Sequence, residues 1–193
     1  VPSDLYADYR DIHFAHRDTV KEMTRTSNRI WSICSRKGYD LPIRSGATKG
    51  DSIRKMVEHL KISGFIKERL EMLVADYEFL LERKEKLEKF MAEAIIENDK
   101  MLALMQLPGV YYHAAFVVTA IVEDAKRFSS AAKLTAYAGL SPMVNTSGEE
   151  EQKAMLKGGP GKPLDGEGRM DLKFYCCEAG QTVLNLCSKS DIG

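Results

Sequence analysis

An apolar seven-residue repeat runs through residues 66–105 and constrains the fold more than any other feature. Ten of its twelve a and d positions are apolar, and the exceptions are Lys84 and Asn98, both at a positions. Without an internal Gly or Pro, the repeat predicts one helix of about 60 Å at 1.5 Å per residue. A small core cannot cover so long a helix, so it must pack against a partner helix.

Two partners are open to this helix. A single Asn at an a position often fixes the register and number of strands, which favours a homodimeric coiled coil. The alternative is an intramolecular pair with a second predicted helix over residues 3–38, which is similar in length. Ser3 is a good N-cap for that helix, and Gly38 supplies a left-handed stop at its end.

Basic side chains gather on one face of the predicted helix 3–38. At 100° per residue, six cations share an arc of about 120°. They are Arg10, Arg17, Lys21, Arg25, Arg29 and Arg36. Such a stripe can follow a phosphate backbone, whereas the alternative is a solvated helix face beside Asp18 and Glu22. Since 28 basic residues cancel 28 acidic ones, nucleic-acid binding must be argued from charge placement rather than from net charge.

Composition narrows the class of protein. A chain of 193 residues with 44% hydrophobic and 29% charged residues is typical of a folded protein. No apolar run approaches the roughly 18 residues of a membrane helix, and no signal-peptide pattern opens the sequence. The four cysteines lack metal-ligand spacing, which predicts reduced, mostly buried thiols in a cytoplasmic protein. His13 and His16 lie one turn apart without a third ligand, so no metal site is expected.

The region after Pro108 and Gly109 is predicted to be compact and helical. We expect helices at 114–122, from Ser129 or Ser130 to Gly139, and at 169–188, with a loop at 141–168. The segment 107–110 is similar to the turn of a helix–hairpin–helix module, whose backbone N–H groups meet phosphate.

The expected fold is therefore mainly α, with long coiled-coil helices and a small helical C-terminal domain that has a helix–hairpin–helix-like start. Its predicted domains are a basic helical segment (1–65), a coiled coil (66–105) and a C-terminal domain (106–193).

Four segments of the second half form a distinctive series. They are LPGVYYHAAFVVTAIVED (107–124), RFSSAAKLTAYAGLSP (127–142), NTSG (145–148) and GRMDLK (168–173). In this order and spacing they resemble the DEDD-type insertion-sequence transposases of the one-ten, one-sixteen and nine-oh-two elements. The first 34 residues also resemble the helical segment that follows the nuclease-like domain in that family.

The resemblance implies a divided recombination site. In this family, an N-terminal ribonuclease-H-like domain supplies four carboxylates for Mg²⁺, and the C-terminal domain supplies a serine that attacks a DNA phosphodiester. The matching serine is Ser147, and the resemblance places Lys157, Arg169 and Lys173 among the nucleic-acid contacts. Its Mg-binding carboxylates are expected before Val1. A structured element-encoded RNA is an implied partner beside DNA, in a homodimer or higher oligomer.

Three functions follow as hypotheses. The first is a transposase that uses Ser147 together with the carboxylate domain. The alternative is a truncated, non-catalytic remnant that dimerises and binds DNA or RNA. A third is a coiled-coil adaptor that binds no nucleic acid.

Overall fold

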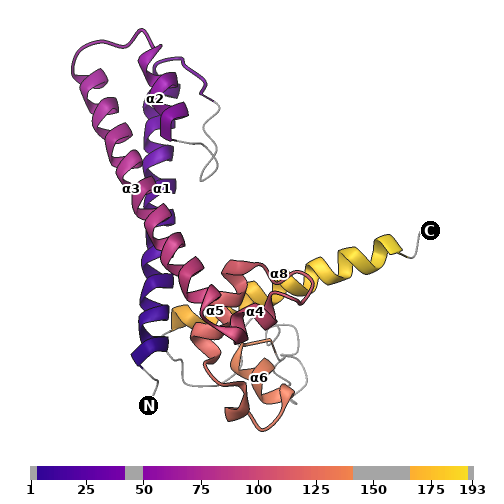
Figure 1. Cartoon of the computed structure of the whole chain (residues 1–193). Helices are drawn as coiled ribbons and strands as arrows, with labels where there is room; N and C mark the ends of the chain where they lie inside the picture. Colours follow the sequence, from indigo (N-terminus) through magenta and orange to yellow (C-terminus); the bar gives the residue numbers. More distant parts are fainter. Residues whose placement is uncertain (1–3, 42–49, 141–165, 191–193) are drawn as a thin grey trace, which may run out of the picture. The chain divides into compact units, whose positions relative to one another are not determined.

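The computed structural model describes residues 4–41, 50–140 and 166–190, with side chains described at 4–41, 53–140 and 170–186. These residues are mostly helical and contain no strand (Figure 1), which confirms the mainly α fold. None of the described helices has the length and apolarity that a membrane crossing requires.

The chain divides into two compact units. The hairpin unit is Ile12–Phe90, and the split unit combines Val1–Asp11 with Met91–Gly193. Both boundaries fall inside long helices, α1 (Asp4–Arg36) and α3 (Phe65–Ile96).

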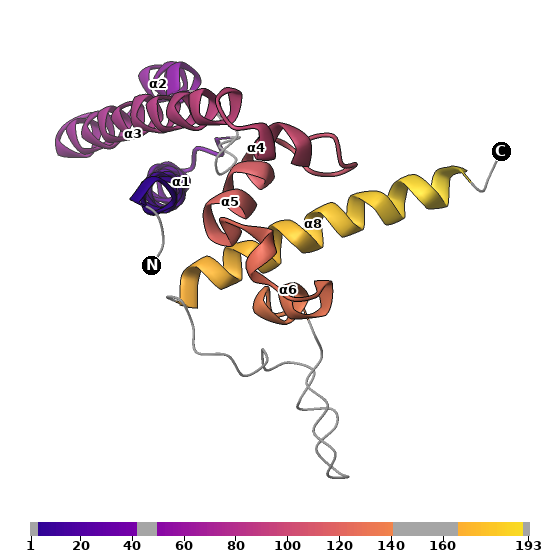
Figure 2. The ribbon, with the colours of Figure 1, turned by 60° about the horizontal axis from the view of Figure 1, so that its bottom comes forward.

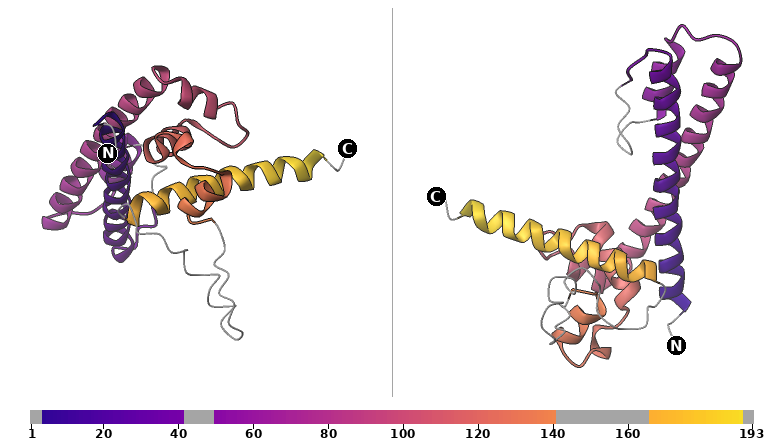
Figure 3. Two further views of the ribbon diagram at one scale, coloured as in Figure 1. Left: turned by 90° about the horizontal axis from the view of Figure 1, so that it is seen from below. Right: turned by 180° about the vertical axis from the view of Figure 1, so that it is seen from behind.

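The hairpin unit is built from α1, α2 (Gly50–Glu58) and α3. Its two long helices lie side by side and run in opposite directions (Figures 1 and 3). Buried apolar side chains from all three helices form one core. They include Met23, Ile30, Ile33 and Cys34 of α1, Ile53 and Val57 of α2, and Leu70, Val74 and Tyr77 of α3. The first heptad positions of α3 are therefore covered within the chain, as the intramolecular alternative predicts, while homodimerisation stays a prediction.

The buried stripe of α3 is wider than a coiled-coil seam. Val74 follows the a position Leu70 by four residues, and the two are 2% and 1% exposed. An apolar stripe that includes such e positions is typical of a helix that packs on more than one neighbour. In this unit the neighbours of α3 are α1 and α2.

The polar a position Lys84 belongs to an ion network between α3 and α1. Its Nζ lies 2.9 Å from Glu88 Oε1, and the same oxygen lies 3.3 Å from His16 Nε2. Burial lowers the pKa of His16, although the contacts with Glu88 act in the opposite direction. This network accounts for the polar side chains of Lys84 and Glu88 on α3 close to His16 of α1.

The prediction of one unbroken helix over 66–105 is wrong. Helix α3 ends at Ile96, and a short helix, α4 (Asp99–Leu104), follows. Between them, extended Asn98 accepts hydrogen bonds through Oδ1 from the backbone N–H groups of Lys100 (3.0 Å) and Met101 (3.4 Å). Asn98 is thus an N-cap, a role that asparagine favours because it satisfies N–H groups without helical partners.

The split unit is centred on α5 (Tyr112–Val122), whose residues Ala115, Phe116 and Val117 are fully buried. Helix α4 and the long α8 (Gly166–Ser190) pack against α5, and Figure 2 shows α8 crossing beside it. From the first turns of α1, the ring of Tyr9 lies 5.3 Å from that of Phe116. The predicted helix 114–122 is therefore confirmed, with two further residues at its start.

Two other local predictions hold in the split unit. Helix α6 (Ala131–Tyr137) begins after Ser130, whose side-chain oxygen accepts from the N–H of Lys133. Gly139 follows the helix with a φ of 70°. The described thiols differ from expectation, because Cys34 is buried but Cys177 is exposed.

The turn between α4 and α5 packs on α8. Gly109 has a φ of 81°, and a Cβ at this position would lie 2.8 Å from both the carbonyl oxygen of Ala179 and the Cβ of Thr182. The glycine therefore permits a left-handed turn and a close approach to α8. This packing role accounts for the glycine without a phosphate contact at the turn.

Candidate nucleic-acid interface

The site residues predicted for the C-terminal region are Ser147, Lys157, Arg169 and Lys173. Ser147 and Lys157 lie outside the described residues, and Arg169 lies in α8 with its side chain outside them. Lys173 is exposed on α8. The predicted basic stripe on α1 can be followed residue by residue.

Arg10, the first residue of that stripe, is engaged within the split unit. Its Nη1 donates to the carbonyl oxygen of Ala120 (3.0 Å) and lies 2.6 Å from Glu123 Oε1. The last carbonyl groups of a helix lack intrahelical donors and carry partial negative charge, so a cation there is stabilising. Arg10 is only 22% exposed. It holds the end of α5, and the nucleic-acid role predicted for it is untested.

Two more cations bind the same end of α5. Lys100 Nζ donates to the carbonyl oxygen of Glu123 (3.2 Å), and Arg127 Nη2 donates to that of Ile121 (3.4 Å). Glu123 itself has a φ of 60°, which is strained for a residue with a side chain. The surrounding cations stabilise this strained end of α5.

Arg127 also explains part of the RFSSAAKLTAY motif. Its guanidinium lies 4.7 Å from the ring centre of Phe128 and 4.9 Å from that of Tyr137. Guanidinium groups are attracted to aromatic faces at such distances. The three motif residues therefore pack together and join the end of α5 to α6.

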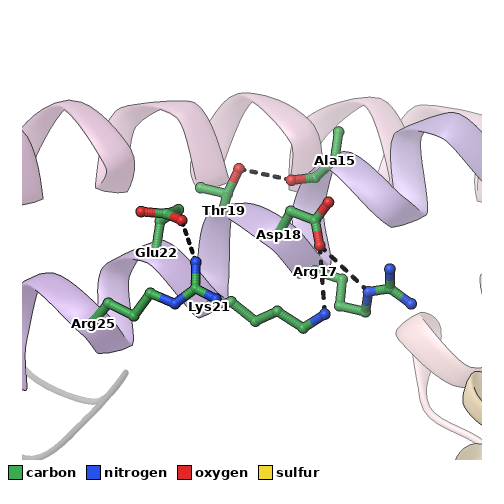
Figure 4. A network of polar contacts seen from close by, with 7 residues as sticks. All are labelled: Ala15, Arg17, Asp18, Thr19, Lys21, Glu22 and Arg25. Atoms are coloured by element: carbon green, nitrogen blue, oxygen red, sulfur yellow. Dashed lines mark hydrogen bonds and ion pairs between the residues drawn. The ribbon is translucent and has the colours of Figure 1, made fainter. Parts of the chain in front are cut away.

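The middle of the α1 stripe carries its own counter-charges (Figure 4). Asp18 Oδ1 lies 3.6 Å from both Arg17 Nε and Lys21 Nζ. Arg25 Nη1 lies 2.6 Å from Glu22 Oε1. Arg17 is only 17% exposed, whereas Lys21 and Arg25 are exposed. Exposed ion pairs contribute about 0–1 kcal/mol, so phosphate groups can replace the carboxylates at Lys21 and Arg25 at little cost.

The end of the stripe opens into three adjoining hollows in the hairpin unit. The largest, of about 390 Å³, is lined by Ile33, Arg36, Lys37, Phe65, Ile66 and Arg69. A second, of about 230 Å³, is lined by Asn28, Arg29, Ser32, Ile33, Arg36 and Arg69. A third, also of about 230 Å³, is lined by Lys37, Tyr39, Lys61, Ile62, Ser63 and Ile66.

These hollows bring together five cations, which we call the hairpin-end cluster. They are Arg29, Arg36, Lys37, Lys61 and Arg69. Only Arg29 and Arg36 belong to the predicted stripe. Lys61 and Arg69 lie beside Arg36 and Lys37 because the chain folds back between α1 and α3. A helical wheel of α1 alone cannot predict that they belong to the same cluster.

A different hollow in the same unit shows the contrast. It is about 120 Å³ and is lined by Arg54, Glu58, Lys67 and Glu71, together with two valines. There Arg54 pairs with Glu78, and Lys67 Nζ lies 3.9 Å from Glu71 Oε1. Positive charge is compensated at α2, whereas the described residues that line the other three hollows include no Asp or Glu.

A tyrosine–histidine cluster in the split unit offers no ready nucleophile. Burial raises the pKa of Tyr175 to about 12, with smaller contributions from Asp171 and Tyr112. Its ring stacks on that of His113, with centres 5.8 Å apart. The phenol therefore stays protonated near neutral pH, which suits a packing role.

The described residues do not fit a Mg²⁺ site. Within that part of the chain, no group of three or more His, Cys, Asp or Glu side chains is placed to hold a metal ion. We therefore assign no Mg²⁺ ligand to it.

The chain matches a protein-family model. No curated protein and no solved structure matches the chain. Residues 101–161 match the model of the transposase IS116/IS110/IS902 family. The matched region begins in α4 and includes α5, the 3₁₀ turn Ala125–Arg127 and α6. Over this region, which includes the Gly109 turn and the Arg127 motif, the chain is similar to that transposase family.

Proposed function

We propose that this chain is the nucleic-acid-binding and strand-joining part of an insertion-sequence transposase. The observation that carries the proposal is the family match over residues 101–161, which includes the TSG segment around Ser147. The basic stripe of α1 supports it from a separate part of the chain, because Lys21 and Arg25 are exposed and their carboxylate partners among the described residues lie on the surface of α1.

In the proposed reaction, Ser147 is the nucleophile. Its Oγ forms an ester bond to the phosphorus of a DNA phosphodiester, and the bond from phosphorus to the leaving sugar oxygen breaks. The serine proton passes to a base, and the leaving oxygen takes up a proton. The strand stays attached as a phosphoserine, which conserves the ester bond for rejoining. A serine hydroxyl is a weak nucleophile and needs such activation.

The carboxylates and their Mg²⁺ belong, in this proposal, to the nuclease-like domain that the sequence resemblance implies. DNA is the substrate, a structured RNA is the further partner, and the working form is a homodimer or higher oligomer. The basic stripe of α1 and the exposed Lys173 supply phosphate contacts.

A covalent-adduct experiment tests the nucleophile. The chain is combined with a carboxylate domain of the matched family, in trans or as a fusion, with Mg²⁺ and labelled DNA. We expect an adduct that survives denaturing electrophoresis, and mass spectrometry should locate the DNA on Ser147. The Ser147→Ala variant should form none.

Thr146→Ala is the matched control, because it removes a neighbouring hydroxyl and should leave the adduct intact. An adduct of parental yield in Ser147→Ala would overturn the assignment. If neither parent nor control forms an adduct while both bind DNA, the alternative of a non-catalytic binding remnant is supported instead.

A further inference from the structure

The hairpin-end cluster differs from the rest of the α1 stripe in its lack of counter-charge. Among the described residues, no carboxylate oxygen lies within the 4.0 Å ion-pair distance of Arg29, Lys37, Lys61 or Arg69. Arg36 Nε donates to the carbonyl oxygen of Ser32 at 3.2 Å. Lys21 and Arg25, in contrast, each have a carboxylate partner on α1.

Helix stability explains only part of this cluster. Arg36 and Lys37 lie at the C-terminal end of α1, where positive charge stabilises the helix dipole. Arg69 lies in the second turn of α3 and Lys61 lies between α2 and α3, so neither is at the C-terminal end of a helix. The cations also repel one another across the shared hollows. An arrangement that costs stability and gathers positive charge points to an anionic ligand.

An exposed aromatic ring accompanies these cations. Phe65 is 79% exposed and lines the largest hollow together with Arg36 and Arg69. Nucleic-acid proteins that bind single strands combine cations for the backbone with aromatic rings on which unpaired bases stack. A hollow of about 390 Å³ is of the size of small-ligand sites. It suits one unpaired nucleotide, whereas the bases of a duplex are already stacked on each other.

We propose that the hairpin-end cluster binds a single-stranded stretch of nucleic acid. Arg36, Lys37 and Arg69 contact successive phosphates, and one base stacks on Phe65. This inference rests on the proposed function, since it takes nucleic acid as the partner, and it adds which form of nucleic acid is bound and where.

Salt-dependent binding tests the phosphate contacts. The full chain is titrated against a labelled oligothymidine of about 12 nucleotides, a length typical of single-strand sites, at several salt concentrations. The slope of log K against log salt falls by about 0.7 for each lost phosphate contact on a single strand, so Arg36→Gln with Arg69→Gln should reduce it by about 1.4.

The matched control is Arg83→Gln with Lys86→Gln, which removes the same charge from exposed positions of α3 away from the hollows. Its slope should stay at the parental value. If the two double variants give equal slopes, the cluster is not the binding site. Far-UV circular dichroism checks that each variant keeps its helices.

Substitution of the aromatic ring tests the base contact. Phe65→Ala should weaken oligothymidine binding at least about fivefold, the lower end of what one base–aromatic stack contributes. Phe65→Tyr should retain binding. Phe79→Ala, which removes another exposed ring of α3 (65% exposed), should bind like the parent.

A duplex of the same length distinguishes the form of nucleic acid. Duplex binding should not change in Phe65→Ala, because its bases are not available for stacking. An equal loss for strand and duplex would overturn the assignment to unpaired nucleotides, as would parental strand binding by Phe65→Ala.

The Ser147→Ala variant separates this inference from the proposed function. It should bind oligothymidine like the parent, because the hairpin-end cluster takes no part in bond formation. If the parent forms no covalent adduct but still binds oligothymidine, the result counts against Ser147 as the nucleophile and not against the hairpin-end site. Adduct formation together with parental binding by the Arg36 and Arg69 variant counts against the hairpin-end site alone.

Discussion

At position 109, two separate constraints exclude a side chain. The backbone φ is 81°, and a Cβ would meet α8 at 2.8 Å from Ala179 O. The Pro108–Gly109 pair was enough to predict a helix end from sequence, because turn chemistry is local. The contact with α8 joins residues about 70 positions apart. Sequence patterns, which act over a few residues, cannot predict it.

Replacement of this glycine should destabilise the protein. Gly109→Ala is expected to lower the free energy of unfolding by about 1–3 kcal/mol, through backbone strain and overpacking. Gly180→Ala is the control, since a Cβ there meets nothing within 4 Å. It lies inside α8 and should raise stability by about 0.5–1 kcal/mol. Urea denaturation measures both, and equal effects would contradict the close packing.

Arg10 and Arg25 belong to the same predicted stripe but should behave differently. Arg10→Gln removes hydrogen bonds to the end of α5 and should cost about 1–3 kcal/mol of unfolding free energy. Arg25 is 63% exposed, so Arg25→Gln should change stability by no more than about 0.5 kcal/mol. Thermal or urea unfolding compares the two. A neutral Arg10→Gln would contradict the structural role of Arg10 at the end of α5.

At the scale of elements, local signals predicted most helices and misassigned one residue. The long first helix, the Ser130 cap and the apolar helix 114–122 all depend on residues close in sequence. The structure contains a long first helix over Asp4–Arg36, the cap, and the apolar helix over Tyr112–Val122. The heptad pattern places Asn98 at a core a position, whereas the structure shows it as the N-cap of α4. The pattern records only its spacing from the apolar residues, and both roles fit that spacing. Only the hydrogen bonds of its side chain separate the two roles.

Asn98→Ile distinguishes these roles. Loss of an N-cap costs about 1 kcal/mol, so the variant should unfold at lower temperature and keep its oligomeric state. An asparagine in a coiled-coil core would give the opposite result, because an apolar residue there raises stability and changes the number of strands. Thermal melts and sedimentation of parent and variant measure both properties.

The pairing of α1 with α3 should depend on pH through His16. Its pKa lies below the ordinary 6.5 in the folded protein because burial disfavours the charged ring. The unfolded chain then binds more protons near and below pH 6.5, so stability is full above that pH and falls on acidification.

The free energy of unfolding of the parent should therefore decrease between about pH 7.5 and 5.5. His16→Gln should flatten this dependence, whereas His59→Gln, at an exposed position of the same unit, should not. The pKa of Glu88 is also lowered, since its contacts with Lys84 and His16 outweigh burial, but it titrates below this window. Equal pH profiles for both variants would contradict the role of His16.

At the scale of the whole molecule, the mainly α class followed from periodicity, whereas the grouping of segments did not. The hairpin-end cluster draws on the end of α1, the segment before α3 and the start of α3. These three segments lie together because α1 packs against α3. A heptad repeat favours pairing without naming the partner, so sequence alone left the intramolecular and dimeric alternatives open.

The intramolecular core makes helix content independent of protein concentration. Far-UV circular dichroism should therefore stay constant over about a hundredfold dilution, since only folding that requires association responds to mass action. Sedimentation over the same range measures any dimer separately. A loss of helix on dilution would show that association, rather than the buried core of the hairpin unit, holds α1 and α3 together.

The split unit is interrupted in the chain by residues 12–90, and this has a kinetic consequence. The contact of His16 with Glu88 lies near both ends of that insertion, so closure of α1 on α3 shortens the path between residues 11 and 91. We therefore expect refolding to be fastest when residues 12–90 form the hairpin unit first. The entropy of closing that long loop is then already lost when residues 4–11 meet the segment after residue 90.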